Sequence, residues 1–181
     1  MTRSLEAVEG ALEGWRGSQP FILGLCGAQG SGKSTLSDGL AHALNAKGVR
    51  TQVLSLDDLY LSHDQRAELA RQVHPLFAVR GVPGTHDIQQ GIDLLDVVKA
   101  GQSVVLPRFD KATDNPGPRA QWPVVDGALD VLIFEGWCVG ARPQDARALI
   151  DPVNDLEAQR DLDGRWRRHV NEALFGTYAD L

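Results

Sequence analysis

Apolar residues recur along the chain at two different spacings, and these spacings predict helices and strands in alternation. The first segment repeats them at intervals of three and four residues, at Leu5, Val8, Leu12 and Trp15. This spacing predicts an amphipathic helix that lies on the domain and ends near residues 17–20.

Four later segments have the composition of strands. Residues 21–26 form a short apolar run before a glycine-rich turn, and residues 51–56 are rich in β-forming residues. Residues 103–106 predict a third strand. The fourth, residues 130–134, opens on Asp130 and is then continuously apolar, as in a parallel strand covered on both faces, and it ends at Glu135.

Helix signals lie between these strands. After the glycine-rich turn, one face of a helix is marked by Leu36, Leu40 and Leu44. Ser62 and Gln65 have the spacing of a capping box, which predicts a helix to about residue 73. Asp87 is predicted to cap a further helix that stops at Gly101. Residues 108–122 lack either period and predict an ordered surface loop, whereas residues 143–181 are predicted to be helical.

This order of elements predicts an α/β fold. Strands that alternate with helices favour right-handed crossovers and a central parallel sheet flanked by helices, with the ligand at the carboxyl ends of the strands. A length of 181 residues suits one domain, in which residues 1–19 form the N-terminal helix and residues 20–181 form the core.

The glycine-rich turn matches the phosphate-loop pattern G-x-x-x-x-G-K-[ST]. Its predicted nucleotide-binding residues are Gly27, Ala28, Gln29, Gly30, Ser31, Gly32, Lys33, Ser34 and Thr35. The glycines let backbone amides surround phosphates at the positive end of the next helix. Lys33 is expected to reach the β- and γ-phosphates of ATP, and the Ser34 hydroxyl to ligate Mg2+. The flanking strand and helix favour this interpretation over an incidental turn and predict a three-layer P-loop NTPase fold.

Carboxylates at the ends of two predicted strands add candidate chemistry. Glu135 is placed to reach the Mg2+, directly or through water, with a solvent-facing side chain as the alternative. Asp57 and Asp58 end the second strand, where one would orient and deprotonate an acceptor hydroxyl and the other would help to hold Mg2+-bound water. An Asx turn is the alternative for this pair, and position alone does not choose between the two aspartates.

The charge balance excludes several classes of partner. A net charge of −6 argues against a nucleic-acid surface, and no apolar run approaches the roughly 20 residues that cross a bilayer.

Cys26 and Cys138 lie in apolar stretches without metal-ligand spacing, so both are predicted to be buried thiols. We expect a cytoplasmic protein that acts on a small molecule, and the sequence leaves its oligomeric state open.

The residues of the phosphate loop, residues 55–60 and residues 134–136 resemble the phosphoribulokinase, uridine kinase and pantothenate kinase superfamily. Four longer blocks narrow the resemblance to the D-glycerate 3-kinases: residues 74–76, 80–87, 106–112 and 135–140. Residues 154–157 and 164–167 extend the agreement, which covers most of the chain from about Phe21 onward.

The resemblance implies roles for individual residues. It implies an ATP- and Mg2+-dependent kinase in which Asp57 is the catalytic base, and the motif and strand-end arguments above add Lys33 and Glu135 to the catalytic set. The residues it implies on the acceptor side are Tyr60, His86, Asp87, Arg108 and Lys111, and we assign Asp58 to the same side. Arg108 or Lys111 would pair with a carboxylate such as that of glycerate. The alternatives are a helix cap for Asp87, a loop histidine for His86 and solvated charges for the two cations.

The chain departs from the family pattern in two places. Residues 111–116 lack the second acid and following basic residue of this loop in the relatives. Superfamily members also continue with further parallel strands, an adenine-side loop and a lid, so we expect a fold that is incomplete on its C-terminal side. A nucleoside or pantothenate-type kinase, and a nucleotide-binding protein without transfer activity, are the alternative functions.

Overall fold

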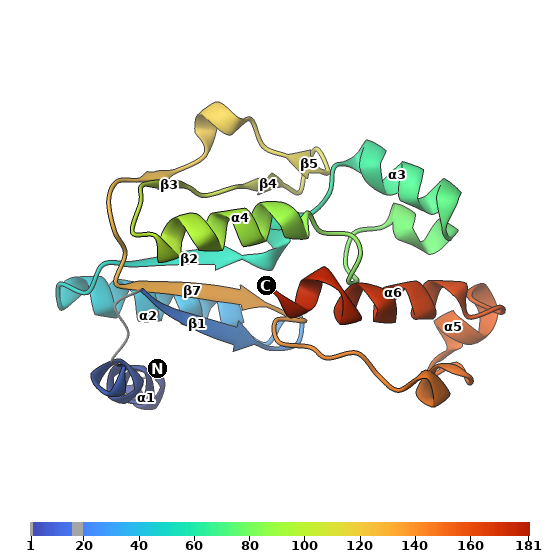
Figure 1. Cartoon of the computed structure of the whole chain (residues 1–181), viewed down its shortest axis with the longest axis horizontal. Coiled ribbons are helices and arrows are strands. Elements are labelled where there is room, and N and C mark those ends of the chain that lie inside the picture. The colour runs from blue at the N-terminus through green and yellow to red at the C-terminus, as the bar shows by residue number, and fades with distance from the viewer. Residues whose placement is uncertain (1, 16–19) are drawn as a thin grey trace.

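The structure is a computed structural model that describes residues 2–15 and 20–181. Its centre is a three-stranded parallel sheet, whose strands lie one above another in Figure 1. β7 (Val131–Gly136) lies between β1 (Phe21–Cys26) and β2 (Thr51–Ser55). Phe21 and Thr51 both pair with Val131, so the three strands run in register and end at one level. β7 is buried along its whole length because both of its edges are paired and both faces are covered.

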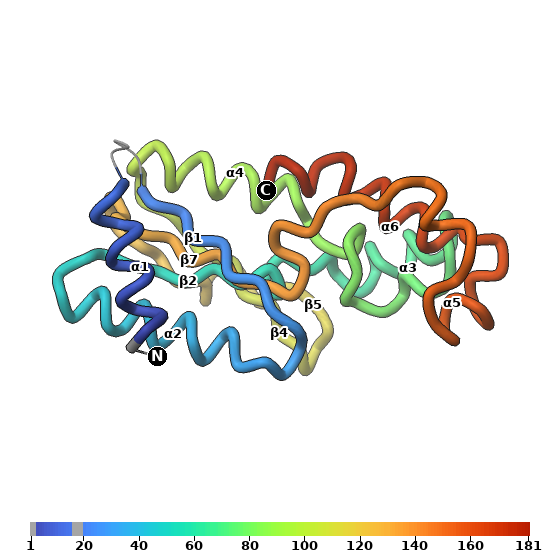
Figure 2. The backbone as a smooth tube through the Cα atoms, turned by 90° about the horizontal axis from the view of Figure 1, so that it is seen from below, coloured from blue at the N-terminus to red at the C-terminus, as the bar shows by residue number. Residues whose placement is uncertain are grey.

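Helices cover both faces of this sheet, which confirms the predicted layers (Figures 1 and 2). α2 (Lys33–Ala46) lies on one face and α4 (Ile88–Lys99) on the other. α1 (Thr2–Gly14) packs against α2 on the outside. The end predicted for α1, near residues 17–20, falls largely outside the described residues.

The side chains of β7 divide the core into two halves. Val131 and Ile133 point into the half formed by α1 and α2, whereas Leu132 and Phe134 point into the half formed by α4. This alternation is what a strand between two helical layers requires, because successive side chains point to opposite faces.

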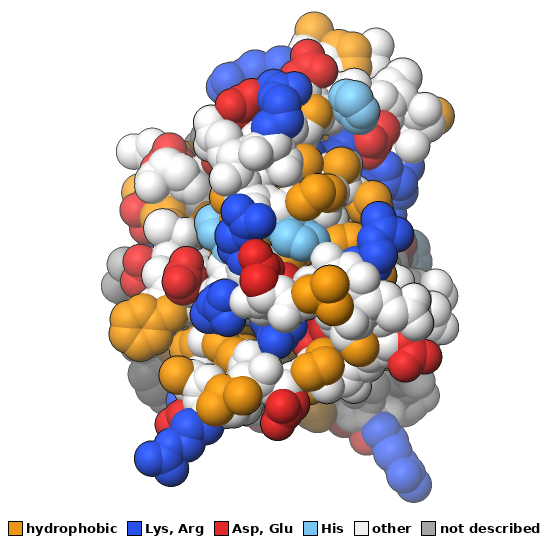
Figure 3. All heavy atoms as spheres, turned by 90° about the vertical axis from the view of Figure 1, so that its right-hand side faces the viewer, with side chains coloured by type: hydrophobic (Ala, Val, Ile, Leu, Met, Phe, Trp, Pro, Cys, Tyr) orange, Lys and Arg blue, Asp and Glu red, His pale blue; other side chains and the backbone are white. Residues whose placement is uncertain are grey.

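The remaining helices lie beyond the carboxyl ends of the strands, at the right of Figure 1. α3 (His63–Gln72) begins with the predicted capping box of Ser62 and Gln65. The C-terminal segment forms α5 (Asp155–Arg160) and α6 (Arg165–Phe175), with short 3-10 turns before and after them. Figure 3 views this end and shows acidic and basic side chains interspersed with apolar ones. None of the described helices is long and apolar enough to span a membrane.

The prediction of a third strand at residues 103–106 is wrong for the main sheet. Only β3 (Val104–Val105) forms there, and it pairs antiparallel with β6 (Val124–Val125) in a separate ribbon. The predicted loop at residues 108–122 also contains a small hairpin of β4 (Phe109–Asp110) and β5 (Asn115–Pro116). Strands of two residues are too short to produce the alternating pattern by which a strand is recognised.

The two cysteines differ in exposure. Cys138 is buried as predicted, but Cys26 is exposed, because it ends β1 at the edge of the sheet. Its thiol hydrogen-bonds to the carbonyl oxygen of Trp137 at 3.2 Å.

The central position of β7 leads to a stability prediction. Leu132→Ala removes a side chain that is 0% exposed, so we expect it to lower the free energy of unfolding by about 2–5 kcal/mol. Leu162→Ala makes the same chemical change at a side chain that is 82% exposed and should change it by less than about 0.5 kcal/mol. Equal losses in denaturant unfolding would contradict the placement of the core.

Candidate active site

One cleft at the carboxyl ends of β2 and β7 brings together six of the predicted site residues. Its volume is about 310 Å³. The cleft is lined by Ser34, Asp38, Val53, Ser55, Asp57, Asp58, Arg108, Lys111 and Glu135. Side chains of the predicted nucleotide side and the predicted acceptor side therefore face the same space.

The phosphate loop connects β1 to α2. Gly30 has a φ of 74° and Gly32 a φ of 82°, a left-handed conformation that glycine adopts without a steric penalty. Lys33 opens α2, with Ser34 and Thr35 in its first turn, so the free N–H groups of the helix face the loop. This part of the chain has the geometry of an anion site at a helix N-terminus.

Glu135 lies at the base of the cleft, and its carboxyl oxygens have unequal surroundings. Oε1 accepts hydrogen bonds from the hydroxyls of Ser34, at 3.1 Å, and Ser55, at 2.7 Å. Oε2 is buried and has no hydrogen-bond partner in the described part of the chain. A buried carboxylate oxygen without a partner is costly, and a hard divalent cation beside it would remove that cost.

The pair Ser34 and Glu135 therefore fits Mg2+, which favours oxygen ligands. No group of three or more His, Cys, Asp or Glu side chains suited to holding a metal occurs among the described residues. Mg2+ is commonly held by one or two protein oxygens, and phosphates and water complete its coordination.

Asp57 and Asp58 share a 3-10 turn, Leu56–Leu59, but their carboxylates have different partners. Asp58 accepts the backbone N–H of Phe109 at 3.0 Å and pairs with Arg108 at 3.3 Å. Burial raises the pKa of Asp58, although the Phe109 N–H and the Arg108 charge oppose it. Asp57 instead faces the cleft, where its Oδ2 accepts a hydrogen bond from the Lys111 ammonium at 2.7 Å. Asp58 thus ties down the substrate-side loop, and Asp57 remains at the open surface of the cleft.

Tyr60 and His86 form a buried layer beside Asp57. They are joined by a β-bridge, and their rings stack with centroids 4.3 Å apart. Burial lowers the pKa of His86 to about 3, although the charge of Asp57 acts in the opposite direction. Burial, followed by the charge of Asp57 and a hydrogen bond with it, raises the pKa of Tyr60 above its ordinary value. Both side chains are therefore neutral at neutral pH.

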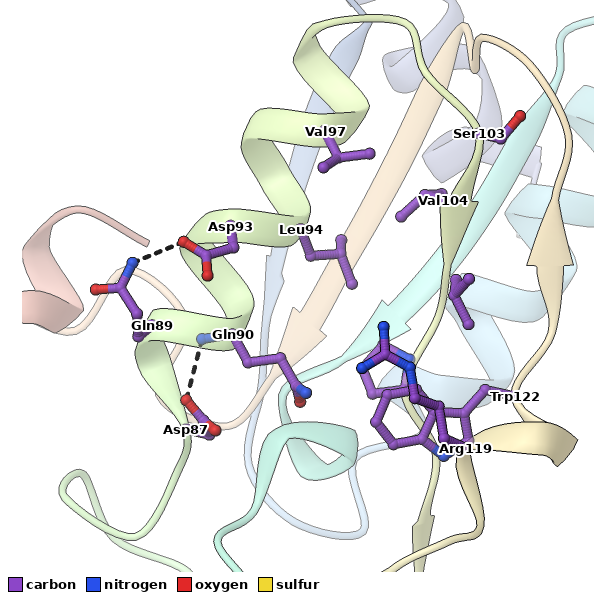
Figure 4. A pocket seen from close by; sticks show the side chains of 12 residues that line it. Asp87, Gln89, Gln90, Asp93, Leu94, Val97, Ser103, Val104, Arg119 and Trp122 are labelled. Carbon is purple, nitrogen blue, oxygen red and sulfur yellow. Dashed lines mark hydrogen bonds between the residues drawn. The ribbon is translucent and has the colours of Figure 1, made fainter.

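Asp87 is not among the residues that line the cleft. Its Oδ1 accepts the backbone N–H of Gln90 at 3.0 Å, so it caps α4 as the alternative interpretation states. It lines a separate hollow of about 470 Å³ beside α4, shown in Figure 4. Arg119 and Trp122 form the opposite wall, with the guanidinium 5.8 Å from the ring centroid. No residue of the phosphate loop lines this hollow.

The sequence interpretation did not identify three residues near these sites. Asp38 follows Ser34 by four residues on α2, and this spacing places both on one face of the helix. Ser55 is the last residue of β2 and could have been found from its position before Asp57. Tyr178 contacts His86 from a distance of 92 residues along the chain, for which the sequence has no local signal.

The chain is similar in sequence to known kinases. No family model matches the chain. An uncharacterized kinase of Schizosaccharomyces pombe, mug58, is 39% identical over 137 residues, which are 71% of this chain and 50% of that protein. The chloroplastic D-glycerate 3-kinase of Arabidopsis thaliana is 34% identical over 170 residues, which cover 84% of this chain and 36% of the relative.

The chain is also similar in structure to a solved kinase. The D-glycerate 3-kinase from Cryptococcus neoformans var. grubii superposes with a TM-score of 0.74 and 27% sequence identity, covering 98% of this chain and 67% of that one. The chain spans half or less of the length of these two curated relatives. The expected fold and superfamily resemblance are confirmed: the relatives and structural neighbours of the chain include P-loop kinases, among them D-glycerate 3-kinases.

Proposed function

We propose that this protein transfers the γ-phosphoryl group of ATP, bound with Mg2+, to a hydroxyl group of a small hydroxy acid, with D-glycerate as the first candidate. The observation that carries the proposal is the single cleft that Ser34 and Glu135 share with Asp57 and Lys111. Transfer requires donor phosphate and acceptor hydroxyl to lie in line within one site, and this cleft provides that space. The D-glycerate 3-kinases among the relatives support the choice of acceptor.

On the nucleotide side, the loop amides and the first turn of α2 would surround the phosphates. The Lys33 ammonium would neutralise the β- and γ-phosphates, which carry the developing charge during transfer. Ser34 and Glu135 would hold Mg2+, which supplies further positive charge to the phosphate oxygens.

On the acceptor side, Asp57 is the base. Its carboxylate would take the proton of the acceptor hydroxyl as that oxygen bonds to the γ-phosphorus and the bond to the leaving ADP oxygen breaks. Arg108 and Lys111 are the two cationic side chains that line the cleft on this side, and they match the carboxylate of a hydroxy acid. Lys111 now pairs with Asp57, so an acceptor carboxylate that attracts Lys111 would also release the base.

A panel of acceptors tests the proposal. Purified protein is incubated with Mg-ATP and D-glycerate, pantothenate, uridine or ribulose 5-phosphate, and ADP release is compared with a sample without acceptor. We expect release that depends on D-glycerate. ADP release with another compound of the panel would identify that compound, instead of D-glycerate, as the acceptor. ATP binding without ADP release for any compound would favour a nucleotide-binding protein without transfer activity.

Lys33→Ala should weaken ATP binding and abolish turnover, because the charge on the β- and γ-phosphates is lost. Calorimetric titration with ATP and ADP release measure the two effects. Lys47→Ala is the matched control, since Lys47 lies at the other end of α2 and pairs with Glu9. Undiminished turnover in Lys33→Ala would remove the loop from the mechanism.

Asp57→Asn should lower kcat by about a hundredfold or more while ATP binding stays nearly unchanged, as expected for loss of a general base. Asp58→Asn should act mainly on the acceptor KM, because Asp58 holds Arg108 and the backbone of Phe109. Steady-state kinetics separate the two effects. An equal fall in kcat from Asp58→Asn, with KM retained, would reverse the assignment.

A further inference from the structure

Tyr178 links the C-terminal end of the described chain to the loop that precedes α4. It lies in the 3-10 turn Thr177–Ala179, which follows α6. Its hydroxyl oxygen lies 2.5 Å from Nδ1 of His86 and accepts the backbone N–H of Gly84 at 3.0 Å. Gly84 has a φ of 98°, so this loop has a backbone conformation that other residues rarely adopt.

The position of the proton in this contact follows from the other bonds of the hydroxyl. Both groups are neutral at neutral pH, because burial lowers the pKa of His86 and raises that of Tyr178. The Tyr178 oxygen already accepts Gly84 N–H, and its proton has no other acceptor among the described residues. The hydroxyl therefore donates to Nδ1 of His86. A neutral imidazole has one N–H, so the ring proton is on Nε2.

That Nε2–H group is an unused donor. It is buried and lacks a hydrogen-bond partner in the described part of the chain. Native proteins pair most buried polar atoms, so an unpaired one in a well-packed layer indicates a ligand or an ordered water. The ring of Tyr60 stacks on His86, and the charge of Asp57 acts on both side chains. The unused donor thus belongs to the layer next to the proposed base.

We propose that Tyr178 is a positioning residue for the acceptor site: it holds His86 as the Nε2–H tautomer, and this N–H donates a hydrogen bond to an oxygen atom of the acceptor. The inference rests on the proposed function and adds a polar contact to it. A neutral donor suits this place, because a protonated imidazole would compete with the acceptor for the Asp57 carboxylate. The chemical class of ligand is a small molecule with several hydroxyl or carboxylate oxygens.

Long-range 15N NMR of the histidine rings tests the tautomer without any substrate. His86→Gln identifies the His86 signals among the five histidines of the chain. In the unchanged protein we expect Nε2 to be protonated and Nδ1 to be an acceptor. Tyr178→Phe removes only the hydroxyl and should shift the ring toward a mixture of tautomers. Tyr60→Phe makes the same change on the stacked ring and should leave the tautomer unchanged.

The acceptor panel, added with Mg-ATP, then tests the donor role. We expect the acceptor that is phosphorylated to move the His86 Nε2–H signal. We also expect Tyr178→Phe to raise its KM roughly tenfold, the fold-change of one neutral hydrogen bond, with kcat within about twofold. His86→Gln combined with Tyr178→Phe should raise KM no further than His86→Gln alone, because the two residues act through one contact.

Each contrary result overturns a defined part of the account. A proton on Nδ1 in the unchanged protein, or an unaltered tautomer in Tyr178→Phe, would overturn the positioning role of Tyr178. An Nε2–H signal that no acceptor moves would overturn the donor role. If an acceptor other than D-glycerate moves the signal and is phosphorylated, the choice of D-glycerate fails while the inference about Tyr178 stands.

Discussion

The hydrogen bonds of the Glu135 carboxylate are the interaction on which the rest of the cleft depends. Glu135 is the last residue but one of the fully buried strand β7, and one of its oxygens accepts hydrogen bonds from Ser34 in the phosphate-loop helix and from Ser55 at the end of β2. The three parallel strands pair in register, and this oxygen contacts both the helix that follows the phosphate loop and the strand that precedes the Asp57 turn. The second oxygen is left for a cation.

The residue after Glu135 allows that turn to approach. A Cβ atom at Gly136 would lie 2.7 Å from the Cβ of Leu56, a distance that real structures do not tolerate. Leu56 begins the 3-10 turn with Asp57 and Asp58, so the glycine allows both aspartates to lie against the end of β7. In the pair Glu135-Gly136, the first residue therefore supplies an oxygen for the cation, and the second leaves room for the neighbouring turn.

The acceptor side depends on a second buried charge. Arg66 is 1% exposed, donates to the carbonyl oxygens of Leu61 and Ala78, and pairs with Asp114 at 2.6 Å. The hairpin of β4 and β5, which carries Lys111, is thus held by two contacts. Asp58 binds its first strand, and Arg66 binds Asp114, which precedes its second strand. Loss of either partner would leave a poorly compensated charge in the interior.

The nucleotide half of the site could be predicted from the sequence, because its signals are local. The phosphate loop and Glu135 each lie at the end of one apolar strand, and the phosphate-loop pattern is a contiguous motif. The hairpin at residues 109–116 could not be predicted, since its strands have two residues each and are held by distant side chains. The contact between His86 and Tyr178 joins residues 92 positions apart and depends on tertiary packing alone.

The role of Glu135 in metal binding is tested by calorimetry, which measures how ATP affinity depends on Mg2+ in the unchanged protein and in Glu135→Gln. We expect Mg2+ to strengthen ATP binding to the unchanged protein. Glu135→Gln should lose most of this gain while its metal-free affinity is retained or improved, because a negative charge near the phosphates is removed. Glu172→Gln, an exposed change on α6, should behave as the unchanged protein. A full Mg2+ gain in Glu135→Gln would contradict the assignment of Glu135 as a ligand of the metal or of its bound water.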